Sequence, residues 1–310
     1  MSTTSRRRFL GQCAATAAGT VFTPALLRAA SAPSLQFPAD PRQRIAVASY
    51  PFREFIAGRE HKQGNPTIEL KDFAAHVVEK LGVNKIEPWT GHFPSTDAKY
   101  FEQFHASVEK ANAAIVNIAV DGESSAYSSD RSERDQAVAF STKWVDAAVI
   151  LGSPSIRTNI APTKSSKPDL DLAAGSLSRV IEYSSAKNIV VNLENDNPVS
   201  EDPFFLVKLI ERVNSPWLRA LPDFCNTLAN MPSDYAYRGI DAMFRLAYCI
   251  SHVKSSETNR KGTVHVDMAK TFGFMKEHGY KGYCSMEWDD PGDPYRGTSG
   301  LIQETLRYLS

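Results

Sequence analysis

Cysteine is scarce in this chain, and neither charge is in excess. Four cysteines occur among 310 residues, and 35 Lys and Arg side chains balance 35 Asp and Glu side chains. A neutral chain lacks the positive field that a nucleic-acid or anionic-membrane surface requires, so we expect no nucleic-acid partner. Beyond residue 32 only Cys225, Cys249 and Cys284 remain, and this odd number does not indicate a disulfide framework. We expect three buried thiols.

Long apolar runs are also lacking, apart from a weak one near the N-terminus. Residues 5–10 read SRRRFL, a twin-arginine pattern, and the weakly apolar run that follows spans 13–27. Small residues at 29–32 offer a signal-peptidase site. We therefore predict a cleaved twin-arginine signal peptide over residues 1–32, export to the periplasm or beyond, and no membrane attachment afterwards. The alternative is a disordered, arginine-bearing N-terminus. No other stretch approaches the roughly 20 apolar residues that a membrane span requires.

From about Arg44 onward, strand-like and helix-like segments alternate without a long linker. Eight segments read as buried strands: Ile45–Tyr50, Lys85–Trp89, Ala114–Val120, Ser155–Asn159, Ile189–Glu194, Leu218–Asp223, Tyr248–Lys254 and Gly282–Trp288. The clearest helical patterns span Leu70–Leu81, with Thr67 as its N-cap, and Arg134–Leu151. Residues suited to a left-handed helix C-cap recur shortly before strands: Gly82, Gly152, Asn188 and Gly279.

This alternation predicts a (β/α)8 TIM barrel that occupies residues 33–310 as a single α/β domain. A doubly wound sheet is the competing fold. It is disfavoured because residues 49–53, which follow the first strand, read SYPFR instead of a glycine-rich phosphate loop. Residues 121–133 form a polar loop at the expected active-site end, either a lid or a solvated loop, and we favour the solvated loop.

Four polar residues each close or nearly close one of the later strands: Glu194, Asp223, His252 and Glu287. They are separated by about 30 residues, the length of one strand–helix unit. Because the carboxyl ends of parallel barrel strands meet at one face, we expect these side chains to converge. Three carboxylates and one imidazole suit a divalent cation of the Mn²⁺, Mg²⁺ or Co²⁺ type. The alternative is a set of ordinary hydrogen-bonded strand ends.

Around these residues the sequence resembles the xylose-isomerase-like TIM barrels, the sugar isomerase and epimerase superfamily. The resemblance covers roughly Arg44 to the C-terminus. It is carried by short motifs in order along the chain: Ile86–Trp89 (IEPW), Asn192–Asn195 (NLEN), Pro222–Asn226 (PDFCN), His252–Lys254 (HVK) and Met286–Trp288 (MEW). Each motif is weak alone, but their order and spacing are specific.

The resemblance implies a metal-dependent proton transfer. Glu194, Asp223, His252 and Glu287 would hold one divalent ion, Mn²⁺ by preference, with Mg²⁺, Co²⁺ and Zn²⁺ as alternatives. Glu194 and Glu287 would also carry the proton to and from the carbon beside a sugar carbonyl, through an enediolate. Lys254 would polarise the carbonyl or neutralise the enediolate, unless it forms only a structural ion pair.

Six further residues are candidates for substrate contacts. Arg157 and Asn226 end strands at the same mouth, and Glu87 either contacts sugar hydroxyls, supports the ligands from behind or forms a salt bridge. The remaining three are the rings Trp89 and Trp288, which would stack on a sugar face, and the loop residue His92.

Three departures from the epimerase pattern put the substrate in doubt. Asn226 stands where the epimerases often have His, Thr258 where they have Arg, and Ser255 where many members have Asp. Substrate recognition therefore differs from that of a typical free-ketose epimerase.

The leading hypothesis is a metal-dependent isomerase or epimerase that acts on a small carbohydrate. The same residues would also serve a lyase or hydrolase that acts on 3-keto-glycosides by β-elimination. A non-catalytic periplasmic sugar-binding protein is the third reading. A homodimer is left open as the assembly.

Overall fold

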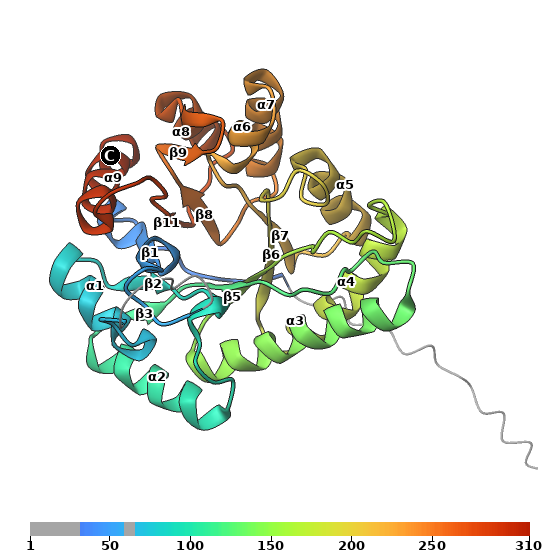
Figure 1. Ribbon diagram of the computed structural model, residues 1–310, viewed down its shortest axis with the longest axis horizontal. Coiled ribbons are helices and arrows are strands. Elements are labelled where there is room, and N and C mark those ends of the chain that lie inside the picture. The colour runs from blue at the N-terminus through green and yellow to red at the C-terminus, as the bar shows by residue number, and fades with distance from the viewer. Residues whose placement is uncertain (1–31, 59–65) are drawn as a thin grey trace, which may run out of the picture. The chain divides into compact units, whose positions relative to one another are not determined.

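Parallel strands surrounded by helices make up the part of the chain that the structure, a computed structural model, describes (Figure 1). The described residues are 32–58 and 66–310. The predicted twin-arginine signal peptide therefore lies outside them, apart from its last residue. The prediction of a TIM barrel is confirmed.

Nine strands from eight chain segments form the barrel, in the order of the sequence, because the third segment is divided into two strands. The strands are β1 (Ile45–Ala48), β2 (Lys85–Glu87), β3 (Ala114–Ile115), β4 (Ile118–Val120), β5 (Ser155–Thr158), β6 (Val190–Glu194), β7 (Leu218–Leu221), β8 (Ile250–Val253) and β11 (Tyr283–Met286). All the pairings among them are parallel, and the strands are buried on both faces, which explains their continuous apolar sequences.

The barrel consists of two sheets joined at two seams. One sheet has the order β3-β2-β1-β11-β8, and the other has the order β4-β5-β6-β7. At the first seam a single bridge joins Trp89 to Ala119. At the second seam, between β7 and β8, isolated bridges join Ala220 to Ala247 and Asp223 to His252. Two of the predicted metal ligands therefore lie directly opposite each other across the second seam.

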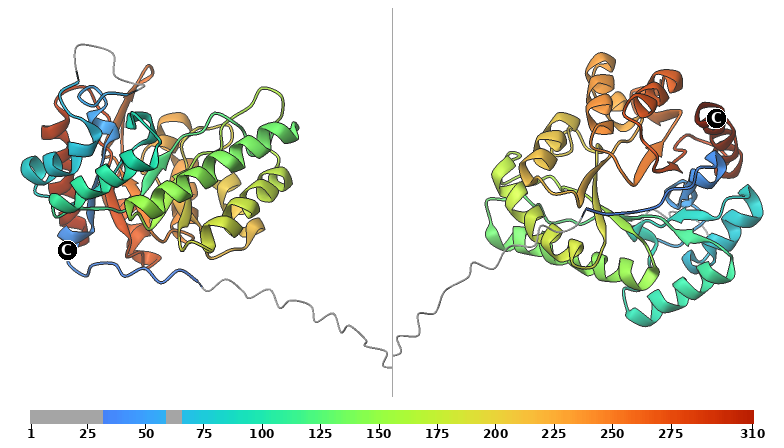
Figure 2. Two further views of the ribbon diagram at one scale, coloured as in Figure 1. Left: turned by 90° about the horizontal axis from the view of Figure 1, so that it is seen from below. Right: turned by 180° about the vertical axis from the view of Figure 1, so that it is seen from behind.

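Helices follow the strands and cover the outside of the barrel, as the view from behind in Figure 2 shows. They are α1 (Phe73–Leu81), α2 (Ala98–Lys110), α3 (Arg131–Leu151), α4 (Leu170–Ser185), α5 (Pro203–Val213), α6 (Asn226–Asn230), α7 (Ser233–Phe244), α8 (Met268–Glu277) and α9 (Pro294–Leu309). Short 3-10 turns are η1 (Pro41–Arg44), η2 (Tyr50–Phe52), η3 (Leu70–Asp72) and η4 (Thr90–His92). The four predicted C-cap residues all have positive φ angles, between 60° and 70°.

The structure differs from the predicted strands and helix caps at three places. The predicted strand 114–120 is divided at Val116–Asn117, because its first part pairs with β2 and its second part with β5. Thr67 caps no helix; Glu69 and Asp72 precede η3 and α1 without side-chain caps. An antiparallel hairpin, β9 (Ser256–Asn259) and β10 (Gly262–His265), follows β8 and was not predicted.

The loop after β4 is packed, so the interpretation as a solvated loop was wrong. Ser125 and Tyr127 are fully buried within it. The N–H of Ser125 donates to Glu133 Oε1, and Ser176 Oγ of α4 donates to the carbonyl of Ala126. The loop is therefore tied to both neighbouring helices.

Opposite ends of the barrel differ in what covers them. The side view in Figure 2 shows the β9–β10 hairpin above one end and the first described residues below the other. There the ring of Phe37 packs edge-on against Tyr248 and Tyr283, and the Tyr248 hydroxyl donates to the carbonyl of Pro33. These contacts cover the N-terminal ends of β8 and β11.

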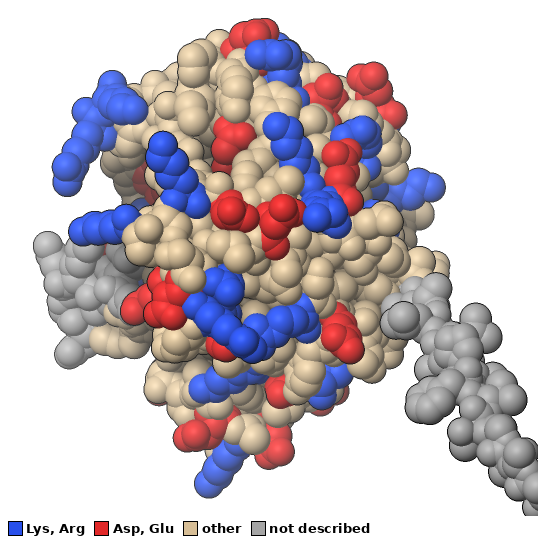
Figure 3. All heavy atoms as spheres, turned by 90° about the vertical axis from the view of Figure 1, so that its right-hand side faces the viewer, with Lys and Arg blue, Asp and Glu red and all other residues tan. Residues whose placement is uncertain are grey.

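Surface charge and helix hydropathy can be compared with what a charged polymer or a membrane would require. Acidic and basic side chains alternate across the face drawn in Figure 3, without a field of one sign. Among the described residues, no helix is long and apolar enough to cross a membrane.

Candidate metal centre

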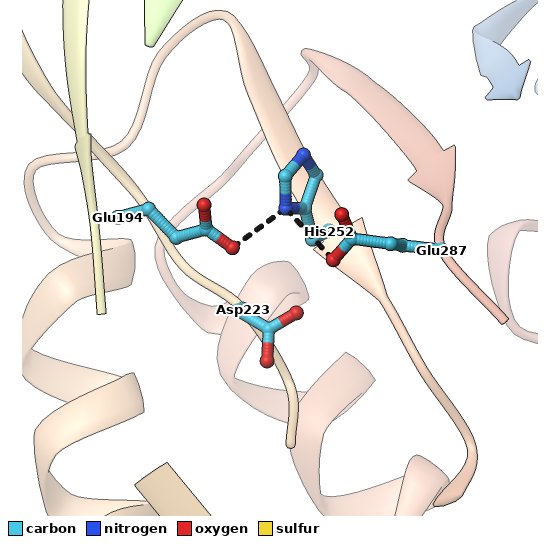
Figure 4. Close-up of side chains that lie close together, drawn as sticks. All are labelled: Glu194, Asp223, His252 and Glu287. Carbon is cyan, nitrogen blue, oxygen red and sulfur yellow. Dashed lines mark hydrogen bonds and ion pairs between the residues drawn. The ribbon is translucent and has the colours of Figure 1, made fainter. Parts of the chain in front are cut away.

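Four side chains from both sheets meet at the carboxyl ends of the strands. Glu194 ends β6, Asp223 follows β7, His252 lies in β8 and Glu287 follows β11. One possible ligand atom from each lies within 4.8 Å of the others, and all four side chains are buried. Figure 4 shows Glu194 and Glu287 reaching the imidazole of His252 from opposite sides, with Asp223 beside them. The arrangement could hold a metal ion.

The imidazole of His252 is fixed by carboxylates at both nitrogens. Its Nδ1 lies 2.7 Å from Glu194 Oε1 and 3.2 Å from Glu287 Oε2. Its Nε2 donates to Glu87 Oε2 over 2.9 Å, and Glu87 also accepts from Asn117 Nδ2 at 2.7 Å. Nδ1 is therefore the nitrogen that faces the cluster, and Glu87 sets the ring orientation from behind.

Asp223 presents one carboxylate oxygen that the protein does not satisfy. Its Oδ1 accepts from the backbone N–H groups of Cys225 and Asn226, at 2.8 and 2.6 Å. Its Oδ2 is buried and has no hydrogen-bond partner among the described residues. The nearest cation, Lys254 Nζ, lies 3.6 Å from it. A buried carboxylate oxygen without a hydrogen bond, beside two other carboxylates, is costly unless a cation binds closely there. The donor set, two glutamates, one aspartate and one imidazole, thus fits a divalent ion.

The carboxylates control the protonation of the cluster. Burial alone would lower the pKa of His252, but Glu194, Glu287 and Glu87 together raise that pKa well above its usual range. Burial would raise the pKa of Glu287, yet His252 and Lys254 lower it strongly. Burial, together with Glu194 and Glu287, raises the pKa of Asp223 to about 7, against the opposite effect of Lys254. His252 is therefore an imidazolium at neutral pH when no metal ion is bound.

Lys254 supplies a second buried positive charge. Its Nζ donates to Asn226 Oδ1 at 2.7 Å and lies 3.1 Å from Glu287 Oε2 and 3.6 Å from Asp223 Oδ2. Burial would lower its pKa, but Asp223, Glu287 and Glu257 raise that pKa well above the usual value. Asn226 in turn donates from Nδ2 to Glu194 Oε1 at 3.3 Å. Lys254 and Asn226 therefore connect the carboxylates on opposite sides of the cluster.

Arg157 holds Glu194 from the other side. Its Nε lies 2.9 Å from Glu194 Oε2, and its Nη1 donates to Asp121. Asp121 also accepts from the indole N–H of Trp89. The ends of four strands, β2, β4, β5 and β6, are thereby linked into one wall beside the cluster.

A polar cavity of about 320 Å³ opens over the cluster. Of the predicted site residues, those on its lining are Glu87, Trp89, Arg157, Glu194, Asn226, Lys254 and Glu287. Asp223 and His252 lie beneath them. Five polar lining residues were not predicted as site residues: Tyr50, Asp121, Asp196, Glu257 and Asp289. Three of these, Asp121, Asp196 and Asp289, stand one or two positions beyond a predicted strand, and that position was the available signal.

Two predicted substrate contacts lie away from this cavity. His92 is buried in η4, where its Nδ1 lies 2.9 Å from Ser49 Oγ, and its ring packs edge-on against Trp89. Trp288 packs against the backbone of Gly297 in α9. His92 therefore supports Trp89 from behind, and Trp288 faces the outer helices.

Comparison with known proteins gives one family and several structural neighbours. Residues 75–310 match the family described as xylose isomerase-like TIM barrel. No curated protein matches the sequence. A D-allulose 3-epimerase from Methylomonas sp. is similar in structure, with a TM-score of 0.66 and 15% identity over 89% of this chain and 100% of that one.

Two further neighbours have similar scores. A xylose isomerase-like TIM barrel protein from Mycobacterium smegmatis, in complex with magnesium, has a TM-score of 0.64 and 18% identity over 86% of this chain and 96% of that one. The 3-keto-D-glucoside 4-epimerase of E. coli has a TM-score of 0.63 and 14% identity over 85% of this chain and 98% of that one. At these identities the likeness establishes the fold.

Metal binding should release protons. An ion at this site needs a neutral Nδ1 on His252 and an ionised Asp223, so about one to two protons leave per ion at pH 7. Affinity should rise with pH and fall as the pH drops through about 7, where Asp223 takes up its proton. Calorimetric titration with Mn²⁺ in two buffers of different ionisation heat measures this number. In H252A the release should fall by about one proton, and binding without proton release in the unsubstituted protein would contradict the assignment.

Replacing Glu87 by Gln should weaken metal binding without removing a ligand. The change keeps the side-chain shape but removes the charge that holds the Nε2 proton of His252. We expect affinity to fall about 10- to 100-fold, as for other residues that orient metal-bound histidines. Competition with a chelator measures the affinity, and E277Q on the exposed end of α8 is the control. Unchanged affinity in E87Q would show that Glu87 does not orient the imidazole.

Proposed function

The chain belongs to the xylose isomerase-like TIM barrel family, and from that premise we propose that it is a metal-dependent sugar isomerase or epimerase that moves a proton next to a carbohydrate carbonyl. One observation carries the proposal. Glu194 and Glu287 approach the same imidazole nitrogen from opposite sides, on the floor of a polar cavity large enough for a small sugar. A substrate above them would have a carboxylate on each side.

Glu194, Asp223, His252 and Glu287 would hold the ion. We propose Mn²⁺, because three carboxylates favour a hard cation and one imidazole favours a first-row metal. A magnesium complex is known for the Mycobacterium smegmatis neighbour, so Mg²⁺ is the first alternative to test. When bound, the ion would supply Lewis acidity to a carbonyl oxygen of the sugar.

The two glutamates would exchange the proton. One carboxylate takes the proton from the carbon beside the carbonyl, the C–H electron pair forms the C=C bond, and the carbonyl electrons move to oxygen. The sugar is then an enediolate, and the opposite glutamic acid, or the same one, returns a proton to carbon. Lys254, 3.1 Å from Glu287 Oε2, keeps a positive charge beside the oxygen that gains electrons. Arg157 holds Glu194 in position during the exchange.

The charge of the cavity supports a neutral substrate. Its lining contains the carboxylates Glu87, Asp121, Glu194, Asp196, Glu257, Glu287 and Asp289. The cations on the same lining are Arg157 and Lys254, and both already contact carboxylates. The cavity would stay acidic even with a divalent ion bound, and a phosphate group would be repelled. An unphosphorylated keto-sugar fits this environment.

The two other readings have less support. D-Allulose, L-ribulose and 3-keto-D-glucoside epimerases are among the structural neighbours, and these names give no support to the lyase reading. A non-catalytic sugar-binding protein would bind a sugar without exchanging its proton, so measurement of proton exchange separates it from the proposed enzyme.

Replacing Glu287 by Gln should abolish most turnover. The amide cannot carry the proton, and loss of a general acid or base costs about 10²- to 10⁴-fold in rate. The measurement is deuterium uptake from D₂O beside the carbonyl of a ketose panel, with the metal content of each sample determined. E277Q, the same chemical change at an exposed position, should behave like the unsubstituted protein. Near-normal exchange by metal-loaded E287Q would contradict the role of Glu287 as a proton carrier.

Phosphorylated ketoses should be poor substrates. The acidic lining predicts that kcat/KM for D-fructose 6-phosphate is at least about tenfold below that for D-fructose, and that added salt narrows the difference. Exchange rates for the two sugars at low and high ionic strength provide the test. A preference for the phosphate ester would show that the carboxylates on the lining do not exclude negatively charged substrates.

A further inference from the structure

A second cavity lies beside the one above the metal-type cluster. It has a volume of about 450 Å³, larger than the 320 Å³ of its neighbour and within the range of small-molecule sites. It is enclosed by the loop after β4 and by the facing sides of α3 and α4, among them Phe140, Ser176 and Leu177. None of the site residues predicted from the sequence lines it.

The two cavities lie on opposite faces of the same strand ends. Trp89 lines the first cavity, and the next residue, Thr90, lines the second; Arg157 and Thr158 alternate in the same way. This follows from strand geometry, because successive side chains point to opposite faces. Asp121, at the end of β4, lines both cavities. The cavities therefore meet at Asp121, on the rim of the barrel, and a ligand that occupies both would cross the rim there.

The lining suits a neutral, polyhydroxylated ligand. Hydroxyl and amide groups of Thr90, Ser124, Gln136 and Asn159 can bond to sugar hydroxyls, and the half-buried ring of Phe140 offers an apolar face. The charged residues on the lining are two acids, Asp121 and Glu123, and one base, Lys143. Lys143 already donates to Thr96 Oγ1. The cavity thus lacks the excess of cations that a phosphate or sugar acid would need.

The loop that forms one side of this cavity is already fixed. Besides its bonds to Glu133 and Ser176, its Gly122 exchanges two hydrogen bonds with the side chain of Asn159, at 2.8 and 3.0 Å. Gly122 also lies against Phe140, since a Cβ built there would approach the ring to 2.9 Å. A ligand would enter a preformed site and would not have to order the loop.

We propose that this second cavity holds the distal unit of a two-unit neutral carbohydrate, whose keto-sugar unit lies over Glu194 and Glu287. The inference rests on the proposed function and makes it narrower. The substrate is a glycosylated keto-sugar, and the residues around Phe140 select it over the free monosaccharide.

Ala137 and Ala139 of α3 provide a matched pair of variants. Ala137 lines the cavity, whereas Ala139 is exposed on the same helix. A137W places an indole in the cavity, and A139W places the same side chain in solvent. Q136W is a second filling variant at an exposed position on the lining, where a large side chain is less of a risk to folding. Thermal unfolding of each metal-loaded variant establishes that it is folded.

The probes are D-fructose and three disaccharides that carry a glycosyl group on a fructose unit: turanose, lactulose and isomaltulose. They place the second ring on three different oxygens. Deuterium uptake from D₂O and calorimetric binding are measured for each. The unsubstituted protein should prefer at least one disaccharide to D-fructose by tenfold or more, in kcat/KM and in affinity. A137W and Q136W should bring this ratio close to one, and A139W should keep it.

The two proposals fail in different ways. The protein could exchange the proton of D-fructose but show no preference for a disaccharide, or show the same preference in A137W and A139W. Either result would overturn the second-cavity proposal and leave the proposed function in place. No exchange on any probe would contradict the proposed function. In that case the calorimetric binding data test the second-cavity proposal. A binding preference for a disaccharide that is lost in A137W and kept in A139W would support the proposal. No such preference would overturn it.

Discussion

Negative charge withdrawn from water is the constraint on which the rest of this site depends. Glu87, Glu194, Asp223 and Glu287 are all buried around His252. Each ionised carboxylate loses several kcal/mol of hydration there, and nearby hydrogen-bond donors and positive charge must offset that loss. The imidazolium of His252 and the ammonium of Lys254 provide it in the metal-free chain, and this explains the raised pKa of both groups. A bound divalent ion would take over the part played by the imidazole proton.

Much of the barrel could be predicted because its signals are local. A buried parallel strand is a short apolar run, and Gly152 ends α3 with a positive φ angle that few other residues tolerate. The four candidate ligands could be named for the same reason, since each stands at or near a strand end. Support of the ligands was one of three roles considered for Glu87, but its partner His252 could not be named, because it is 165 positions away. The spacing of residues along the chain does not predict that contact.

Tertiary contacts also explain the errors. The β9–β10 hairpin consists of polar residues that would read as loop; its Ser256 and Thr258 donate to Asp290, beyond β11. His92 looks like a solvated loop residue, but Ser49 and Trp89 enclose it. In each case the deciding partner comes from another strand–helix unit. The same applies to the second cavity, which exists only because α3, α4 and the loop after β4 meet.

The candidate metal centre lies across the seam between β7 and β8, so a bound ion would also affect how the barrel closes. Glu194 and Asp223 belong to the four-stranded sheet, and His252 and Glu287 belong to the five-stranded sheet. Only isolated bridges join the two sheets here. An ion held by all four residues would act as a clamp between the two sheets of the barrel, at a place where no continuous backbone ladder joins them. Closure of the barrel and assembly of the reactive site would then be a single event, so a chain with a partly opened seam would lose its chemistry before it lost its fold.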